Sequence, residues 1–240
     1  MNSDCKNITI INGWGAQAAV WNDFVEQLGS AYQIKIIDLP RGETDLGDAF
    51  TLDDLVAELD RKIIAKTHII AWSLGGNVAM AFANKYSVKV ASLLTVAASP
   101  KFVQGNGWNN GMPSDTFDEF YQSVLIDELK ALKIFAGLQA VSDRNEKTVL
   151  KKLRELTGER QQLNKQVLAA SLDILRSIDQ RDSWLKLSCP EKHVYGENDH
   201  LVPLEVADFS HNSLVMRGVS HAPMLSATAE FAAIVKDFIA

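Results

Sequence analysis

Six short apolar runs, separated by helical patterns, set the strongest limit on how this 240-residue chain can fold. Most of the runs are continuous rather than alternating, which is typical of strands buried on both faces of a parallel sheet. Strand–helix alternation of this kind predicts a doubly wound α/β fold with right-handed crossovers. The strands are expected near Ile8–Ile11, Ile34–Asp38, Thr67–Ala71, Val90–Val96, His193–Tyr195 and Leu214–Met216, and helices over Val20–Leu28, Thr51–Ala65, Gly75–Tyr86 and Ala227–Ile239.

The alternation breaks between about Pro100 and Pro190. This stretch opens with the turn-rich segment QGNGWNNGMPSD and continues as three or four helices with no clear strand. A helical block inserted between strands of one sheet is most simply a cap over one end of that sheet. We therefore expect a core of residues 1–100 and 190–240, with residues 101–189 inserted as a helical cap.

Composition limits the cellular compartment and the classes of partner that we expect for the chain. No apolar run reaches the ~20 residues that a membrane span needs, and the first residues show no signal-peptide pattern. The cysteines, Cys5 and Cys189, suggest neither a disulfide framework nor a metal site. The net charge of −6 argues against nucleic acid as a partner. We expect a cytoplasmic protein that binds neither a membrane nor nucleic acid.

Residues 69–83, IIAWSLGGNVAMAFA, lead from an apolar strand through a serine and two glycines into a small-residue helix. One interpretation is a plain strand-to-helix turn. The other is a nucleophile elbow, a turn so tight that it needs small residues two positions before and after the serine. An elbow would place Ser73 at a helix N-terminus, where the Leu74 amide can point at a developing oxyanion. Ala71, where glycine is usual, is a tolerable departure.

A serine nucleophile needs a base, and the base needs an orienting acid. His221 lies in a loop after the last predicted strand, at the edge where open α/β sheets collect active sites; an ordinary surface histidine is the alternative. Asp199 follows the strand that ends at Tyr195, with Glu197 as the nearby alternative and a turn role open for both. The chain order Ser73, Asp199, His221 is that of α/β-hydrolases. Three such signals on successive strand ends favour a catalytic triad.

The second oxyanion donor is expected from the loop after the first strand. The stretch IINGWGAQAAVW places a glycine-rich loop there. The Trp14 amide is the expected donor, and its indole could wall an acyl pocket. A tight turn before a helix explains the same glycines, and the two interpretations are compatible. Of the other histidines, His68 and His193 are interpreted as structural, and His200 and His211 as exposed.

The assembled pattern resembles the α/β-hydrolase superfamily across the whole chain. Within it, the sequence is most similar to the pimeloyl-acyl-carrier-protein methyl ester carboxylesterases of biotin synthesis. The stretches that carry this resemblance are NGWG…VW, IIDLPRGE, AWSLGGNVA, LLTVAASPKF, FAGLQ, LDILRSIDQRD, VYGENDHLVP and VSHAPMLSATAEF. Two features depart from the family pattern: Asn12 stands where histidine is common, and PRGETD replaces a glycine- and serine-rich turn.

The resemblance implies an α/β-hydrolase fold and a serine esterase that needs no metal or organic cofactor. It implies oxyanion and ester contacts at Trp14 and Leu74. The substrate would be a short diacid methyl ester, tethered by phosphopantetheine to an acidic acyl-carrier protein. Besides Trp14, Ser73, Leu74 and His221, the substrate-binding residues would be those of one cap stretch, Phe135, Ala136, Gly137, Leu138 and Gln139.

Residues 130–165 are strongly basic, with nine Lys or Arg against four Asp or Glu in a chain that is acidic overall. Their spacing places several of these cations on one stripe of a helix. A solvated face is the ordinary interpretation. Docking of an acidic carrier is the functional one, because such charges steer association. The candidate docking residues are Lys130, Arg144, Lys147, Lys151 and Arg154.

Rival functions stay open. A general carboxylesterase, a C–C bond hydrolase or a lyase of menaquinone synthesis could use the same triad, although enzymes that act on charged small acids would need a buried arginine near Ser73. A ligand receptor on a hydrolase scaffold is the non-enzyme alternative. Haloalkane dehalogenases and epoxide hydrolases carry aspartate at the elbow, so Ser73 disfavours them.

Overall fold

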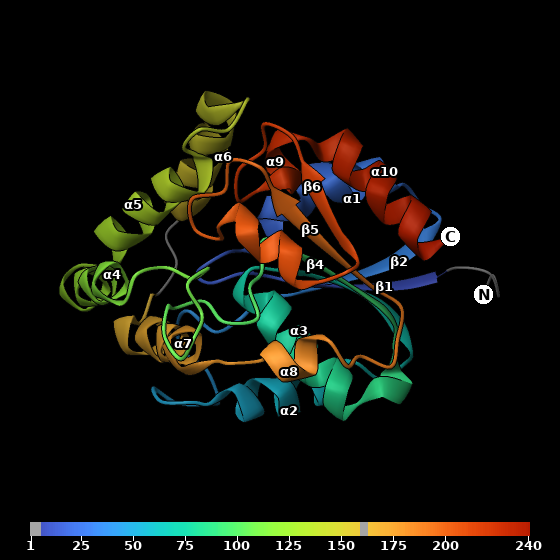
Figure 1. Ribbon diagram of the computed structural model, residues 1–240, viewed down its shortest axis with the longest axis horizontal. Helices are drawn as coiled ribbons and strands as arrows, with labels where there is room; N and C mark the ends of the chain where they lie inside the picture. Colours follow the sequence, from blue (N-terminus) through green and yellow to red (C-terminus); the bar gives the residue numbers. More distant parts are fainter. Residues whose placement is uncertain (1–5, 159–162) are drawn as a thin grey trace.

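The computed structural model describes residues 6–158 and 163–240, whose strands form one parallel sheet with helices on both faces (Figure 1). The strands pair in the order β2-β1-β3-β4-β5-β6. Each predicted strand is present and differs by at most two residues at either end. Their bounds are β1 Lys6–Ile11, β2 Tyr32–Ile37, β3 Thr67–Trp72, β4 Val90–Val96, β5 Glu191–Gly196 and β6 Ser213–Met216. The predicted doubly wound α/β fold is therefore confirmed.

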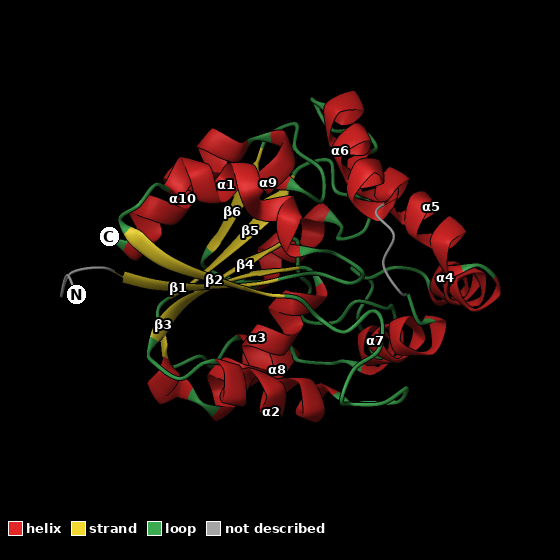
Figure 2. Ribbon diagram, turned by 180° about the vertical axis from the view of Figure 1, so that it is seen from behind, coloured by secondary structure: helices red, strands yellow, loops and turns green. Residues whose placement is uncertain are grey.

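Helices cover the two faces of this sheet in separate groups (Figures 1 and 2). One face carries α1 (Asn22–Leu28), α9 (Pro223–Ser226) and α10 (Thr228–Ile239). The other face carries α2 (Leu52–Lys62), α3 (Leu74–Lys85) and α8 (Arg181–Trp184). Because both faces are covered, β3 and β4 are buried almost throughout, whereas the edge strand β2 alternates. Short 3₁₀ turns complete the core: η1 Ala18–Trp21, η2 Ser87–Lys89 and η3 Leu204–Phe209.

Four helices between β4 and β5 lie beyond the carboxyl ends of the strands, at the opposite end of the molecule from the two termini (Figure 1). They are α4 (Ser114–Ile126), α5 (Glu128–Ala140), α6 (Glu146–Gly158) and α7 (Lys165–Ser177). We propose that they act as a cap on the core, in line with the expected insertion of residues 101–189. The last part of that stretch belongs with the core, since the Trp184 ring of α8 stacks on His193 of β5 at 4.9 Å.

Two sequence-based expectations concern the membrane and the cysteines. Within residues 6–158 and 163–240, no helix combines the length and the apolar character that crossing a lipid bilayer requires. Cys5 lies outside the described residues. Cys189 is half-buried, and burial raises the pKa of its thiol.

The strand order changes direction between β1 and β3, which is the feature of the fold that positions a site. Chain segments that leave these neighbouring strands cross to opposite faces of the sheet, so the loops after them diverge and open a crevice at the carboxyl edge. The loop after β1 holds Gly13 and Trp14, and the turn after β3 holds Ser73. The fold therefore brings the predicted nucleophile and the predicted oxyanion loop together.

Candidate active site

Ser73 occupies a strained turn between β3 and α3. Its φ of 55° and ψ of −125° lie in a region that residues with a side chain rarely adopt. The Ser73 amide donates to the Val96 carbonyl of β4 at 2.9 Å, which anchors the turn to the sheet. A Cβ added to Gly75 would lie 2.4 Å from the Asn12 carbonyl oxygen, so the second residue after the serine must be glycine. This geometry has the features of a nucleophile elbow.

His221 and Asp199 meet beside this turn. The distance from His221 Nδ1 to Asp199 Oδ2 is 2.8 Å, and both side chains are only 1% exposed. His221 Nε2 is buried and has no hydrogen-bond partner among the described residues. Ser73 and His221 line the same pocket. The free ring nitrogen is therefore available to a group in that pocket, which is the position of a general base in a serine hydrolase.

The structure distinguishes between the two candidate acids. Asp199 Oδ1 accepts hydrogen bonds from the amides of Leu201 at 2.8 Å and Val202 at 3.1 Å, so the carboxylate that faces His221 is fixed in orientation. Glu197 is exposed and accepts from the Gly218 amide instead. Asp199 is thus the acid that the structure brings to His221.

The loop after β1 packs directly on the serine turn. A Cβ added to Gly13 would lie 3.2 Å from Ser73 Cβ. The Trp14 amide, which lies outside the helices and strands, has no acceptor among the described residues. The Leu74 amide belongs to the first residue of α3, where helix geometry supplies no acceptor. Both predicted oxyanion donors are thus unpaired beside Ser73.

The pocket that contains Ser73 and His221 is apolar and has a volume of about 500 Å³. Of the described residues that line it, none carries a carboxylate, an amine or a guanidinium. Its walls come from the core loops and from α4, α5 and α7. Besides Ser73 and His221, the lining residues are Trp14, Phe102, Met112, Thr116, Phe117, Phe120, Phe135, Leu138, Leu172, Leu175 and Leu201.

Trp14 links the core to the cap at this pocket. Its indole Nε1 donates to the Leu168 carbonyl of α7 at 2.9 Å. Its ring meets those of Phe120 and Phe135 edge to face, with centroids 5.5 and 5.1 Å away. The indole therefore walls the pocket, as the sequence indicated.

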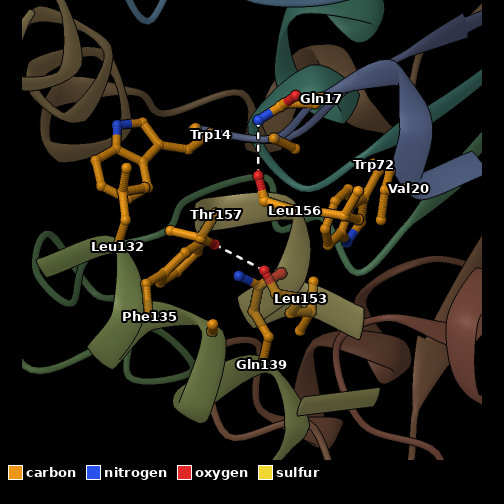
Figure 3. Close-up of a pocket in the computed structure, with 13 residues that line it drawn as sticks. Trp14, Gln17, Val20, Trp72, Leu132, Phe135, Gln139, Leu153, Leu156 and Thr157 are labelled. Atoms are coloured by element: carbon orange, nitrogen blue, oxygen red, sulfur yellow. Dashed lines mark hydrogen bonds between the residues drawn. The ribbon is translucent and has the colours of Figure 1, made fainter. Parts of the chain in front are cut away.

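The five cap residues expected to bind substrate do not share one pocket. Phe135 and Leu138 line the pocket of Ser73. Ala136 and Gln139 line a neighbouring pocket of about 390 Å³ between α5, α6 and the loop after β1, with Phe135 on the boundary (Figure 3). Gly137 lines neither of the two. In Figure 3 this second pocket is closed on the α6 side by Leu153, Leu156 and Thr157.

The sequence interpretation missed the pocket walls that α4 and α7 supply. Phe117 and Phe120 come from α4, and Leu172 and Leu175 come from α7. Helical apolar spacing marked these segments as cap, but that spacing does not distinguish residues that face a pocket from those that face other helices.

Asn12, the departure from the family pattern, is buried in a hydrogen-bond network. Its Nδ2 donates to Asp38 Oδ1, and its Oδ1 accepts from Trp21 Nε1, each at 2.5 Å. Both polar atoms of the side chain are therefore partnered, one by the exposed Asp38 and the other by the buried Trp21. Asn12 acts here as a structural support for the loop that follows β1.

The candidate docking residues are exposed on the cap, but not on one helical stripe. Lys147, Lys151 and Arg154 lie on α6, and Lys130 lies on α5. Arg144 precedes α6, and its guanidinium is paired with Glu230 of the core at 2.6 Å. The spacing suggested a helix that began before residue 144, and the turn before α6 breaks that stripe. Glu159 and Arg160 of the charge count lie outside the described residues.

The remaining histidines have other surroundings. His193 is fully buried against Thr95 and Trp184, and burial lowers its pKa to about 4. Burial also lowers the pKa of His68. His200 and His211 are exposed, as the sequence indicated.

Comparison with known proteins first defines the class. A model of the alpha/beta hydrolase family matches residues 10–234. An esterase from Exiguobacterium antarcticum superposes with a TM-score of 0.83 at 18% identity, covering 98% of this chain and 91% of that one. A bromoperoxidase from Bacillus anthracis gives a TM-score of 0.83 at 17% identity, with coverages of 98% and 92%. The class is that of the α/β hydrolases.

Sequence relatives then narrow the family. The chain is 33% identical over 242 residues to a pimeloyl-[acyl-carrier protein] methyl ester esterase of Aliivibrio salmonicida, with 98% of this chain and 92% of the relative covered. The esterase of the same name from Aeromonas salmonicida is 32% identical over 242 residues, with coverages of 97% and 95%. The biotin biosynthesis bifunctional protein BioHC of Teredinibacter turnerae is 30% identical over 253 residues, which cover 97% of this chain and 44% of that protein. This chain belongs to the α/β hydrolase family and, within it, to the group of the pimeloyl-[acyl-carrier protein] methyl ester esterases.

Proposed function

We propose that the protein is a serine carboxylesterase that hydrolyses the methyl ester of pimeloyl-[acyl-carrier protein], releasing methanol and the free pimeloyl carboxylate for biotin synthesis. The observation that carries this proposal is the uncharged, apolar pocket around Ser73 and His221. A methyl ester masks the terminal carboxylate of the acyl chain, so such a pocket can accept the ester end without pairing a charge. The near-full-length relatives supply the substrate class.

The proposed mechanism follows from the atoms that face the pocket. His221 Nε2 takes the proton from Ser73 Oγ as that oxygen attacks the ester carbonyl. The amides of Trp14 and Leu74 hold the oxyanion, and Asp199 fixes the His221 tautomer through Nδ1. The methoxide leaves as methanol with the proton from His221. Water, deprotonated by His221, then attacks the acyl-enzyme and releases the carboxylate and Ser73.

The test compares two substrates with the same protein. We expect pimeloyl-[acyl-carrier protein] methyl ester to be cleaved with a much higher kcat/KM than p-nitrophenyl butyrate. If only the small ester were cleaved, the protein would be a general carboxylesterase and the carrier-bound substrate would be rejected. A chain that cleaves neither ester and is inert to an active-site phosphonate would instead be a receptor on a hydrolase scaffold.

We also propose that the acidic carrier protein docks on the basic face of the cap. Lys147 and Arg154 are exposed on α6 and form no ion pair with the described acids. Lys151 Nζ lies 3.9 Å from Glu155 Oε1, which is a long ion pair between two exposed side chains. Lys130 adds an exposed cation on α5. Arg144 contributes less to this face, because Glu230 already neutralises its charge. Exposed charges of this kind mainly raise the association rate.

The double variant Lys147→Glu/Lys151→Glu should lower kcat/KM for the carrier-bound ester by about tenfold at low salt, because it replaces two attractive charges by repulsive ones. The loss should shrink as ionic strength rises, and kcat/KM for p-nitrophenyl butyrate should stay unchanged. The matched control is Lys66→Glu/Lys85→Glu, which makes the same charge change at exposed positions outside the cap. Equal losses in the two double variants would reject docking on α6.

A further inference from the structure

The turn between α5 and α6 is hydrogen-bonded to the loops that carry His221 and Asp199. This turn, residues 141–145, includes Ser142 at a φ of 65°, a strained conformation for a residue with a side chain that persists only where its surroundings enforce it. The cap is thus fixed to the catalytic loops at this turn. The bonds to these loops run from Arg144 N to Gly218 O (2.7 Å), from Asn198 Nδ2 to Ser142 O (2.7 Å), and between His200 Nε2 and Ser142 Oγ (3.0 Å). A further bond, from Asn145 Nδ2 to Ser226 O (2.8 Å), joins the turn to the end of α9.

Asp143, in the middle of this turn, is a buried carboxylate that the proposed mechanism does not use. It is 6% exposed. Its Oδ2 accepts from the Ser220 amide at 2.8 Å, and its Oδ1 accepts from Ser226 Oγ at 2.5 Å and from the Asn145 amide at 2.7 Å. These donors are all neutral. Burying a carboxylate is costly without such bonds, and bonds to an ionised acceptor are shorter and stronger than neutral ones.

The backbone at His221 is held from three sides. The amide of Ser220, the residue before His221, donates a hydrogen bond to the Asp143 carboxylate. The His221 amide donates to the Gln139 carbonyl at the end of α5, at 3.3 Å. The His221 carbonyl accepts from Trp72 Nε1 at 2.9 Å, and Trp72 immediately precedes Ser73. Of these three contacts, the bond to Asp143 is the one whose acceptor is a carboxylate, and the one made by a side chain of the turn between α5 and α6.

We propose that Asp143 is a positioning residue: its carboxylate holds the His221 backbone where Nε2 can reach Ser73. The inference rests on the proposed serine-hydrolase function. It gives the cap two roles: the cap encloses the pocket, and through Asp143 it also positions the general base. Without the Asp143–Ser220 bond, the Val219–Ser220 peptide unit, one residue before His221, keeps among the described residues only the bond from the Asn198 amide to the Val219 carbonyl (2.9 Å). A displacement of about 1 Å at a catalytic group can cost about a hundredfold in rate.

The test measures p-nitrophenyl butyrate hydrolysis by Asp143→Ala, Asp143→Asn and a control. We expect kcat to fall about a hundredfold for the alanine variant. The fall should be about tenfold for the asparagine variant, whose remaining carbonyl oxygen can still accept from Ser220. KM should stay within about twofold, since neither change touches the pocket. Asp23→Asn is the matched control: it makes the same substitution in another cap-to-core contact, the ion pair with Lys152, and should leave kcat unchanged.

Active sites are counted in each variant with a p-nitrophenyl alkylphosphonate, which phosphonylates Ser73 and releases one p-nitrophenolate per site. If Asp143 positions His221, every site reacts but the phosphonylation rate constant falls in parallel with kcat. If Asp143 only supports folding, fewer sites react while kcat per reacting site is that of the wild type, and the inference is overturned. Should the alanine variant not fold, the asparagine variant decides by the same criteria. A wild-type protein that turns over neither p-nitrophenyl butyrate nor pimeloyl-[acyl-carrier protein] methyl ester would reject the proposed function itself.

Discussion

Ser73→Ala is expected to lower kcat for p-nitrophenyl butyrate and for the carrier-bound ester by about 10⁴-fold or more, because the nucleophile is lost. The residual rate would come from substrate binding and from the oxyanion donors alone. The fold should be unaffected, since the turn is held by the Ser73 amide and not by its hydroxyl. Steady-state rates together with the unfolding temperature of each variant check both parts of the expectation.

Two comparisons make this result specific. Ser87→Ala, the same change at an exposed position between α3 and β4, should keep the wild-type rate. His221→Ala should cost about as much as Ser73→Ala, and the double variant little more than either alone, because the two residues act as a unit. Retention of a few percent of activity by Ser73→Ala, after contaminating esterases are excluded, would show that Ser73 is not the nucleophile.

Much of the core could be predicted from the sequence because its signals are local. The strand that ends before Ser73 is a short apolar run, which is the pattern of a buried parallel strand. The strand before Asp199 gives a weaker signal, with Val194 and Tyr195 followed by the turn that begins at Gly196. The positions of Ser73, Asp199 and His221 follow from one rule, that parallel strands present their carboxyl ends at the same edge of a sheet. The elbow adds a strict local requirement for glycine at position 75.

The pocket and the cap contacts could not be predicted, because they depend on how helices rotate and on pairs far apart in the chain. Phe135 and Leu138 are three residues apart and share a helix face, whereas Ala136 and Gln139 face another pocket. A contiguous stretch of helix therefore cannot line one channel. Asp143 is 77 residues from its partner Ser220, and nothing in its local sequence marks it as buried.

Gly75→Ala is expected to be among the most destabilising single substitutions in the core. The added Cβ would lie 2.4 Å from the Asn12 carbonyl oxygen and 2.7 Å from that of Ile11, and both are backbone atoms at the end of β1. They cannot move aside, because the Asn12 amide donates to Ile37 of β2 and its side chain is fixed by Trp21. We expect the free energy of unfolding to fall by about 4 kcal/mol or more, measured by denaturant titration.

Gly137→Ala in α5 is the matched control for this effect. Gly137 is also a helical glycine, but a Cβ there would meet no atom within 4 Å. The change should therefore stabilise the protein by up to about 1 kcal/mol, since alanine favours a helix over glycine. If Gly75→Ala were no more destabilising than this control, α3 would not need its close approach to β1. That approach sets the distance between Ser73 and the loop that carries the Trp14 amide, so the proposed oxyanion hole depends on the absence of a single methyl group at position 75.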